Sequence, residues 1–152
     1  MTGQTEMTMM KKMLSRMFLA ACCLAACAEA ARACGCEPLT AKESKKQAEA
    51  VFTGTVIDSY RERGADGEEW RVRLSVEDFW KGDPGDEVVV YTSGECMVTF
   101  EPGKKYLVFA ARQAGRGRLV TEVCRSTAPL DARTEELSKL GKPKQRRPKG
   151  TE

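Results

Sequence analysis

The sequence predicts a single, mainly β domain: a closed or partly open barrel of five short strands with a short helix at each end. Three observations predict this class. Five apolar segments are separated by turns rich in Gly and Pro, which is typical of antiparallel all-β domains. Helix-compatible segments flank them on both sides. The chain has 152 residues, of which 41% are hydrophobic, and this is enough for one domain with one core.

Residues 1–33 predict an export signal. Three basic residues precede an uncharged apolar segment, Met17–Ala28, which is too short to span a membrane. Ala31 and Ala33 are the small residues that signal peptidase prefers before its cut. Cleavage after Ala33 makes Cys34 the first residue of the mature protein, which we then expect to be secreted, periplasmic or at the cell surface.

The same segment contains a competing signal. Leu24–Cys27 resembles the lipobox of bacterial lipoproteins, and Leu19–Cys22 is an earlier copy. In this alternative Cys27 is lipidated and becomes the mature N-terminus, so the protein meets a membrane through its lipid. We favour cleavage after Ala33, because a four-residue motif matches Ala-rich segments by chance.

The domain is expected to open with a helix and a strand. Thr40 and Glu43 have the spacing of a capping box at the start of a helix over 40–48. A strand follows over 50–59. Gly54 within it predicts a bulge or a sharp bend.

A charged turn over 61–68 is expected next, followed by a second strand over 69–79. Apolar and polar residues alternate along this strand, which predicts one buried face. A Gly- and Pro-containing turn over 81–86 leads to a third strand over 88–91. The inward face of the second strand would carry Trp70, Val72, Leu74 and Val76, and the outward face Arg71, Arg73, Ser75 and Glu77.

An irregular loop over 92–101 contains Cys96 and precedes a fourth strand over 106–111. Gly115 and Gly117 then form the hairpin to a fifth strand over 119–124.

A final helix is expected over 131–140, with acidic residues early and Lys139 late, and Gly141 ends it. The basic tail that follows, in the segment 141–152, is expected to be disordered. Five strands with a helix at each end fit the five-stranded OB-fold best. The predicted organisation is therefore a signal peptide over 1–33, a domain over 34–140 and a tail.

The seven cysteines fall into two groups, three within the export segment and four after it. Removal of the first group leaves an even number in an oxidising compartment, which favours disulfides. Three pairings of these four cysteines are open at this point. They are Cys34, Cys36, Cys96 and Cys124.

Composition argues against an enzyme. The absence of histidine excludes His-based triads and His-containing zinc sites. The net charge of +3 does not indicate a nucleic-acid partner. Acidic residues do not form a convincing catalytic pair, and we expect them at exposed strand ends and turns; they are Glu68, Glu69, Glu77 and Asp78. No cofactor is expected.

Three other interpretations of the cysteines and basic residues fit less well. Cys34–Cys36 lacks the Cys-x-x-Cys spacing and βαβ context of a redox dithiol. An all-cysteine zinc site disagrees with export and with the spacing. A single-stranded nucleic acid would need exposed aromatic residues, whereas alternation directs Trp70 inward, away from Arg71 and Arg73.

Several segments in order resemble the tissue inhibitors of metalloproteinases. Cys34-Gly35-Cys36 and then Ala48–Val56 are similar to the opening of that family. Further matching segments follow in the family's order and approximate spacing, and the similarity covers nearly all of 34–140. It points to the bacterial, single-domain form of the netrin-like module, which has an OB-fold. The further segments are Phe79–Gly82, Tyr91–Ser93, Cys96, Gly103–Val108 and Cys124.

The resemblance implies two disulfides, Cys34–Cys96 and Cys36–Cys124, which tie the N-terminal segment across the barrel. Each would close a long loop and contribute about 4 kcal/mol by loop entropy. The family's third disulfide in this domain has no cysteines here. The simplest alternative is that both bonds only hold a small secreted barrel together.

The resemblance also implies a mechanism. The free amine and the carbonyl of Cys34 would chelate the catalytic zinc of a metalloprotease and displace its water. An α-amine has a pKa of about 8, so its metal-binding neutral form is accessible near neutral pH. The protease supplies the zinc, and the protein alone binds no metal. The implied contact edge comprises Gly35, Cys36, Ser93, Gly94, Glu95, Cys96 and Met97.

Two departures favour a second hypothesis, a periplasmic or lipid-anchored interaction module without inhibition. In the family, the side chain after the first cysteine enters the protease's specificity pocket, and Gly35 has none. Glycine here could instead reflect a backbone requirement between bridged cysteines. Lipidation at Cys27 would also leave Cys34 without a free amine. In both hypotheses the partner is a zinc metalloprotease or another extracytoplasmic protein.

Overall fold

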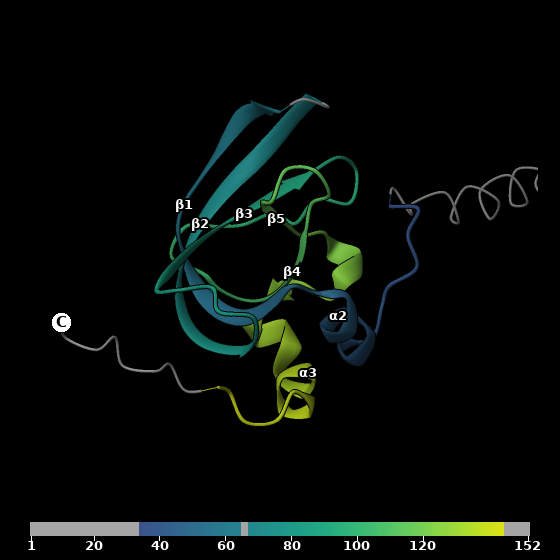
Figure 1. The fold of residues 1–152 in the computed structure, drawn as a ribbon, viewed down its shortest axis with the longest axis vertical. Helices are drawn as coiled ribbons and strands as arrows, with labels where there is room; N and C mark the ends of the chain where they lie inside the picture. Colours follow the sequence, from purple (N-terminus) through teal and green to yellow (C-terminus); the bar gives the residue numbers. More distant parts are fainter. Residues whose placement is uncertain (1–33, 65–66, 145–152) are drawn as a thin grey trace, which may run out of the picture. The chain divides into compact units, whose positions relative to one another are not determined.

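The computed structural model describes residues 34–64 and 67–144, and these form a mainly β domain (Figure 1). The expected fold class is confirmed at this level. The export signal and Cys27 lie outside the described residues. In chain order the elements are α2 (Ala41–Gln47), β1 (Ala50–Gly64), β2 (Gly67–Lys81), β3 (Glu87–Ser93), β4 (Lys105–Arg112), β5 (Leu119–Val120), η2 (Val123–Arg125), β6 (Ala128–Pro129), η3 (Leu130–Arg133) and α3 (Thr134–Lys139).

Five strands close into a ring in the order β1-β2-β3-β5-β4, with β4 pairing back to β1. Neighbouring strands are antiparallel except for β3 and β5, which run parallel. The two-residue strand β6 lies outside the ring and pairs with β4 at Tyr106 and Leu107. β1 closes the ring because its first residues bind β4 on one edge while the whole strand binds β2 on the other.

β1 and β2 form a long hairpin. The prediction of a charged turn over 61–68 is therefore wrong. The two strands stay paired to Gly64 and Gly67. Charged residues occupy facing positions there, and Arg61 lies 3.3 Å from Glu68 across the hairpin. Opposite charges on facing strands stabilise pairing, so polarity here marks an exposed hairpin rather than a loop.

Gly54 marks an irregularity in β1, as expected. The register between β1 and β2 shifts next to it. A Cβ atom at this position would lie 2.8 Å from the carbonyl oxygen of Ser75. Glycine therefore allows the two backbones to approach closely where β1 pairs with both β2 and β4.

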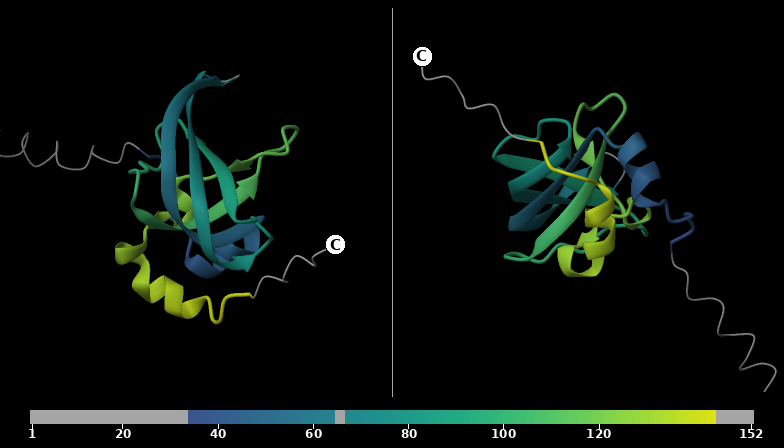
Figure 2. Two further views of the ribbon diagram at one scale, coloured as in Figure 1. Left: turned by 90° about the vertical axis from the view of Figure 1, so that its left-hand side faces the viewer. Right: turned by 90° about the horizontal axis from the view of Figure 1, so that it is seen from below.

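Two hydrophobic clusters stabilise the domain. The larger lies inside the ring and includes Phe52, Leu74 and Tyr106. The alternation expected along β2 is confirmed, since Val72, Leu74 and Val76 are buried and Trp70 packs against this cluster. The second cluster lies between the outer faces of β1 and β4 and the two short helices, which lie together on that side (Figure 2). Its buried members are Ala41, Ala48, Val51, Trp80, Leu107, Phe109 and Leu140.

Helix α2 begins at the expected capping box. The amide of Glu43 donates to the hydroxyl of Thr40, and the Glu43 carboxylate accepts from the Thr40 amide. Both bonds satisfy donors that the first helical turn leaves without partners.

The C-terminal helix and tail differ from expectation. The single helix expected over 131–140 is a 3-10 turn, η3, followed by α3. Gly141, at φ +77°, ends it as expected. The indole of Trp80 donates to the Gly141 carbonyl at 2.8 Å, and the Lys144 amide donates to the carbonyl of Phe79 at 2.7 Å. The first residues of the tail are therefore held against β2; residues 145–152 lie outside the described chain.

The fifth strand is also shorter than expected. β5 ends at Val120, and the chain turns into η2, which ends at Ser126 with φ +63°. The amide of Val123 donates to the carbonyl of Cys96 at 3.0 Å. This turn places Cys124 next to the other cysteines rather than in the sheet. In the part of the chain that the structure describes, no helix is long and apolar enough to cross a membrane.

Candidate functional site

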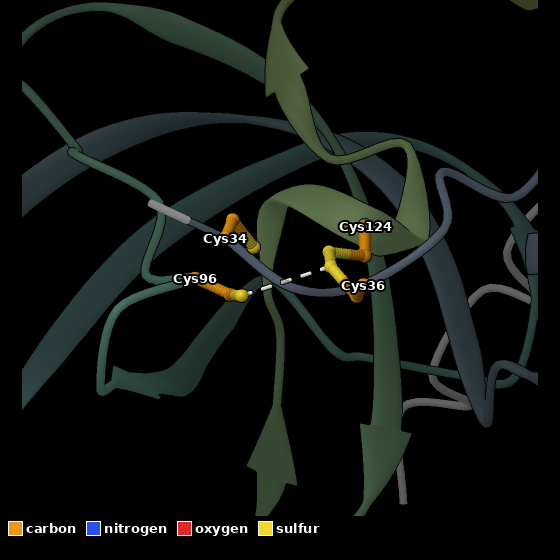
Figure 3. A group of neighbouring side chains, drawn as sticks. All are labelled: Cys34, Cys36, Cys96 and Cys124. Carbon is orange, nitrogen blue, oxygen red and sulfur yellow. Dashed lines mark hydrogen bonds between the residues drawn. A yellow bond between two sulfur atoms is a disulfide. The ribbon is translucent and has the colours of Figure 1, made fainter. Parts of the chain in front are cut away.

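Four cysteines from three separate segments meet at one edge of the domain. The Sγ atoms of Cys34, Cys36, Cys96 and Cys124 lie within 4.8 Å of one another (Figure 3). A disulfide joins Cys36 to Cys124, whose Cα atoms are 6.1 Å apart and whose positions in the sequence differ by 88. The Sγ atoms of Cys36 and Cys96 are 3.6 Å apart. The Cys34–Cys96 pairing stays a prediction.

Sulfur atoms this close could also surround a zinc ion, which thiolates bind at about 2.3 Å in a tetrahedral site. A sulfur atom in a disulfide is not a thiolate, so the bond between Cys36 and Cys124 is incompatible with a four-thiolate centre. This cluster therefore acts as a covalent anchor in the oxidised protein.

Hydrogen bonds support the same anchor. The amide of Leu39 donates to the carbonyl of Cys124 at 2.9 Å, and the Ser126 hydroxyl donates to the carbonyl of Leu39 at 2.6 Å. The Ser44 hydroxyl donates to that of Ser126 at 3.3 Å. The segment between Cys36 and α2 is thus held against η2 by both covalent and polar contacts.

The loop that follows β3 brings the expected contact edge next to this anchor. Thr92 is buried, and its hydroxyl accepts from the Val98 amide at 2.9 Å, which closes the loop at its base. The residues between them are largely exposed, including Met97, whose exposed fraction is 38%. Gly94, at φ +73°, adopts a left-handed conformation that suits glycine. The loop therefore has a fixed base and an accessible tip.

Gly35 is exposed and has free space around it. A Cβ atom built on Gly35 would meet nothing within 4 Å, and its φ lies outside the left-handed range. The interpretation that the backbone requires glycine here is therefore wrong. A side chain at this position would point into open space.

The acidic residues show one correction. Glu69 was expected to be exposed, but only 6% of its surface is accessible. Its two carboxylate oxygens accept from Nη1 and Nη2 of Arg118, both at 2.6 Å. These bonds hold the pKa of the Arg118 guanidinium above its ordinary value. Glu69 is thus neutralised by a bidentate partner.

Tyrosine and arginine side chains alternate across the outer faces of β1, β2 and β3 and the residue before β5. Arg71 donates to the Tyr60 hydroxyl at 2.7 Å and lies over its ring. Arg118 lies 4.4 Å from the ring centroid of Tyr91. Burial lowers the pKa of Arg71, but the hydroxyls of Tyr91 and Tyr60 outweigh this effect and raise it. We call these four residues, Tyr60, Arg71, Tyr91 and Arg118, the Tyr–Arg row.

A groove adjoins the Tyr–Arg row at the end of β3. It has a volume of about 490 Å³ and is bordered by the start of β2, by β5 and by Arg125. Ser93 and Gly94 of the expected contact edge also line it. The sequence analysis missed this groove and the role of Arg118. No sequence signal identifies them, because Glu69 and Arg118 are 49 positions apart and meet only through strand pairing.

Comparisons with known proteins add no assignment. No protein-family model matches the chain, and no curated protein matches its sequence significantly.

Proposed function

We propose that the ring of strands is an OB-fold barrel of the netrin-like type and that the exported protein inhibits a zinc metalloprotease. In this proposal, a second disulfide joins Cys34 to Cys96. Cleavage after Ala33 leaves Cys34 with a free α-amine. The amine and carbonyl of Cys34 chelate the zinc of the protease, and the protein itself is not an enzyme.

The observation that carries this proposal is the position of Cys36. Its disulfide to Cys124 holds the N-terminal segment beside the loop 93–97, where the sulfur atoms of Cys36 and Cys96 are 3.6 Å apart. A chelating end fixed in this way loses little conformational entropy when it binds. The exposed tip of the loop offers a second contact to the same partner.

The mature N-terminus decides whether the mechanism is available. The intact mass of the protein from its native host distinguishes a chain that begins at Cys34 with an unmodified amine from a diacylated chain that begins at Cys27. The first result is required for chelation. The second would contradict it, because Cys34 would then be internal and its nitrogen would be an amide.

Inhibition itself is tested with two forms of the protein that differ by one residue. One begins at Cys34, and the other carries an additional alanine before it. We expect the first to inhibit at least one enzyme in a panel of zinc metalloproteases and the second to lose at least about 100-fold in affinity, since an amide nitrogen does not coordinate zinc. Equal inhibition by both forms would refute the chelate.

Gly35 provides a test in the opposite direction. Because a Cβ atom at Gly35 meets open space, Gly35→Thr should fold normally and add an apolar contact in the specificity pocket. We expect about a tenfold gain in affinity for a protease that the wild type inhibits. If affinity stays the same, position 35 does not enter that pocket.

A second candidate is a lipid-anchored or periplasmic interaction module without inhibitory activity. The missing side chain at position 35 favours it, because most of the apolar contact in the pocket would be absent. Failure of the chain that begins at Cys34 to inhibit any protease in the panel, together with a lipidated Cys27 in the host, would support this candidate.

A further inference from the structure

The groove beside the Tyr–Arg row contains a planar group held in a fixed orientation. The guanidinium of Arg118 donates from Nη1 and Nη2 to Glu69 and from Nε to Gln113, where the distance is 2.5 Å. All three bonds lie in the plane of the guanidinium. Only 8% of the Glu69 side chain is exposed, so this partner is itself fixed.

One face of the same guanidinium is already covered. Arg118 lies over the ring of Tyr91, and Tyr91 in turn interacts with Arg71. The exposed fraction of the Arg118 side chain is nevertheless 21%, and this side chain lines the groove. Three of the five guanidinium N–H groups are bonded to Glu69 and Gln113 and one face lies on Tyr91. We therefore take the opposite flat face as the main surface that Arg118 offers to the groove.

The charges in the groove do not favour a free anion. Arg118 is neutralised by Glu69, and Arg125 lies 3.2 Å from Glu122. Glu68, at the rim, is paired with Arg61. A neutral planar group therefore fits better than a phosphate or a polyanion, because it need not break these pairs.

We infer that this groove receives a planar aromatic side chain from a protein partner, which stacks on the exposed face of Arg118. Guanidinium planes stack on aromatic rings, and a rigid platform of Tyr and Arg is typical of the residues that dominate binding energy at interfaces. The rims at Gly67 and Gly94 have nothing within 4 Å of a Cβ position, which leaves room for the backbone of the partner. A volume of about 490 Å³ accommodates an indole ring.

The inference rests on the proposed function in one respect. Ser93 and Gly94 belong to both the contact edge and the groove, so the partner that binds the edge would also supply the ring. The groove itself is tested without any protease, by adding the small probe N-acetyl-tryptophanamide to the oxidised protein.

We expect saturable binding of this probe with a dissociation constant on the order of 1 mM, as for a small fragment. Nitrogen-15 NMR should show the largest shifts at the Arg118 Nε–H and at the amides of Gly67, Ser93 and Gly94. N-acetyl-leucinamide, which is apolar but not planar, should bind at least about tenfold more weakly. Equal binding of the two probes, or no saturable binding of the first, would overturn the inference.

Matched variants assign the effect to the plane of Arg118. Arg118→Lys keeps the charge but removes the flat surface, and we expect at least a tenfold loss of probe affinity. Arg112→Lys is the control, because Arg112, at the end of β4, also pairs with a glutamate, Glu49, but does not line the groove. Its affinity for the probe should equal that of the wild type. An unchanged affinity in Arg118→Lys would refute stacking on this residue.

The two proposals fail in different ways. If the probe binds as expected but no metalloprotease is inhibited, the groove accepts an aromatic ring and the proposed function is wrong. If a protease is inhibited but the probe does not bind, the chelating mechanism stands and this inference is wrong.

Discussion

The strands of the ring differ in how many of their faces are covered. β1 and β4 face the central cluster on one side and the two helices on the other, so that Val51 and Phe52, or Val108 and Phe109, are buried in succession. β3 and most of β2 face the central cluster on one side only; Trp80, near the end of β2, is buried in the second cluster. The outer faces of β2 and β3 carry the half-exposed Arg71 and Tyr91.

This difference separates a structural half of the ring from a half with accessible chemistry. Successive buried residues over 50–54 of β1 and 106–110 of β4 leave no surface for a ligand there. The outer faces of β3 and of β2 before Trp80 carry no helix, and the Tyr–Arg row crosses them from Tyr60 on the exposed second half of β1 to the groove. The cysteine cluster lies where the two halves meet, because Cys96 follows β3 whereas Cys36 precedes α2, the cover of β1 and β4.

Removal of the Cys36–Cys124 disulfide should have the largest effect, because it anchors the cover of the structural half. The bond closes a loop of 88 positions, for which loop entropy predicts about 4–5 kcal/mol. We expect the Cys36→Ser, Cys124→Ser double variant to lose this amount in guanidinium unfolding. Hydrogen exchange should accelerate more in β1 and β4 than in β2 and β3. Uniform acceleration would contradict the division of the ring into a structural half and an accessible half.

Truncations on the two kinds of strand compare the halves directly. Phe109 is fully buried under the helices on β4, and Phe109→Ala should cost about 3–5 kcal/mol in unfolding free energy. Val89 lies half-exposed on the outer face of β3, and Val89→Ala should cost less than about 1 kcal/mol. Similar losses for both would show that the outer face of β3 is also covered.

The capping box of α2 has a smaller expected effect. Thr40→Ala removes the acceptor for the Glu43 amide and should reduce the unfolding free energy by about 1 kcal/mol. Thr40→Ser keeps the hydroxyl and is the control, with a stability close to that of the wild type. If the two variants are equally destabilised, the methyl group of Thr40 matters and the cap does not.

Glu77 should have the smallest effect, and the effect should depend on pH. Its carboxylate bridges Thr55 at 2.9 Å and Lys105 at 2.5 Å, and the hydrogen bond from Lys105 is the main cause of its lowered pKa. A lowered pKa in the folded state stabilises the protein above the unfolded pKa, and this contribution is lost as the pH falls through the folded pKa.

Glu77→Gln should therefore destabilise the protein near neutral pH and have no effect below the lowered pKa that Glu77 has in the folded state. Because both side chains of the pair are about 40% exposed, we expect less than about 1 kcal/mol. Urea unfolding at the two pH values measures the difference. In a Lys105→Gln background the effect of Glu77→Gln should shrink; an undiminished, pH-independent loss would rule out the ion pair as its cause.

Local sequence signals predicted the elements that depend on neighbouring residues. The capping box at Thr40, the irregularity at Gly54, the alternation along β2 and the helix end at Gly141 all appear in the structure. The errors share another cause. The hairpin beyond Arg61 depends on cross-strand pairing of charged residues, and the short β5 depends on strands distant in the sequence; polarity or apolar content alone reveals neither.

The candidate site divides in the same way. Sequence identified the four cysteines and the loop 93–97, because cysteine content and a family resemblance carry that information. It gave Glu69 the wrong environment and did not identify Arg118. A buried carboxylate requires a partner, and this partner reaches Glu69 only because β2 pairs with β3 and β3 pairs with β5.

By itself, the amino-acid sequence determined the mainly β class, the capped helix α2 and the residues available for cross-linking, because these follow from local propensity, periodicity and residue chemistry. Tertiary structure alone decided which faces of the ring are covered and which polar residues share a groove. Coverage and pairing depend on contacts between segments many positions apart. Such contacts form, and stabilise the fold, only after the chain has met the entropy cost of closing the ring.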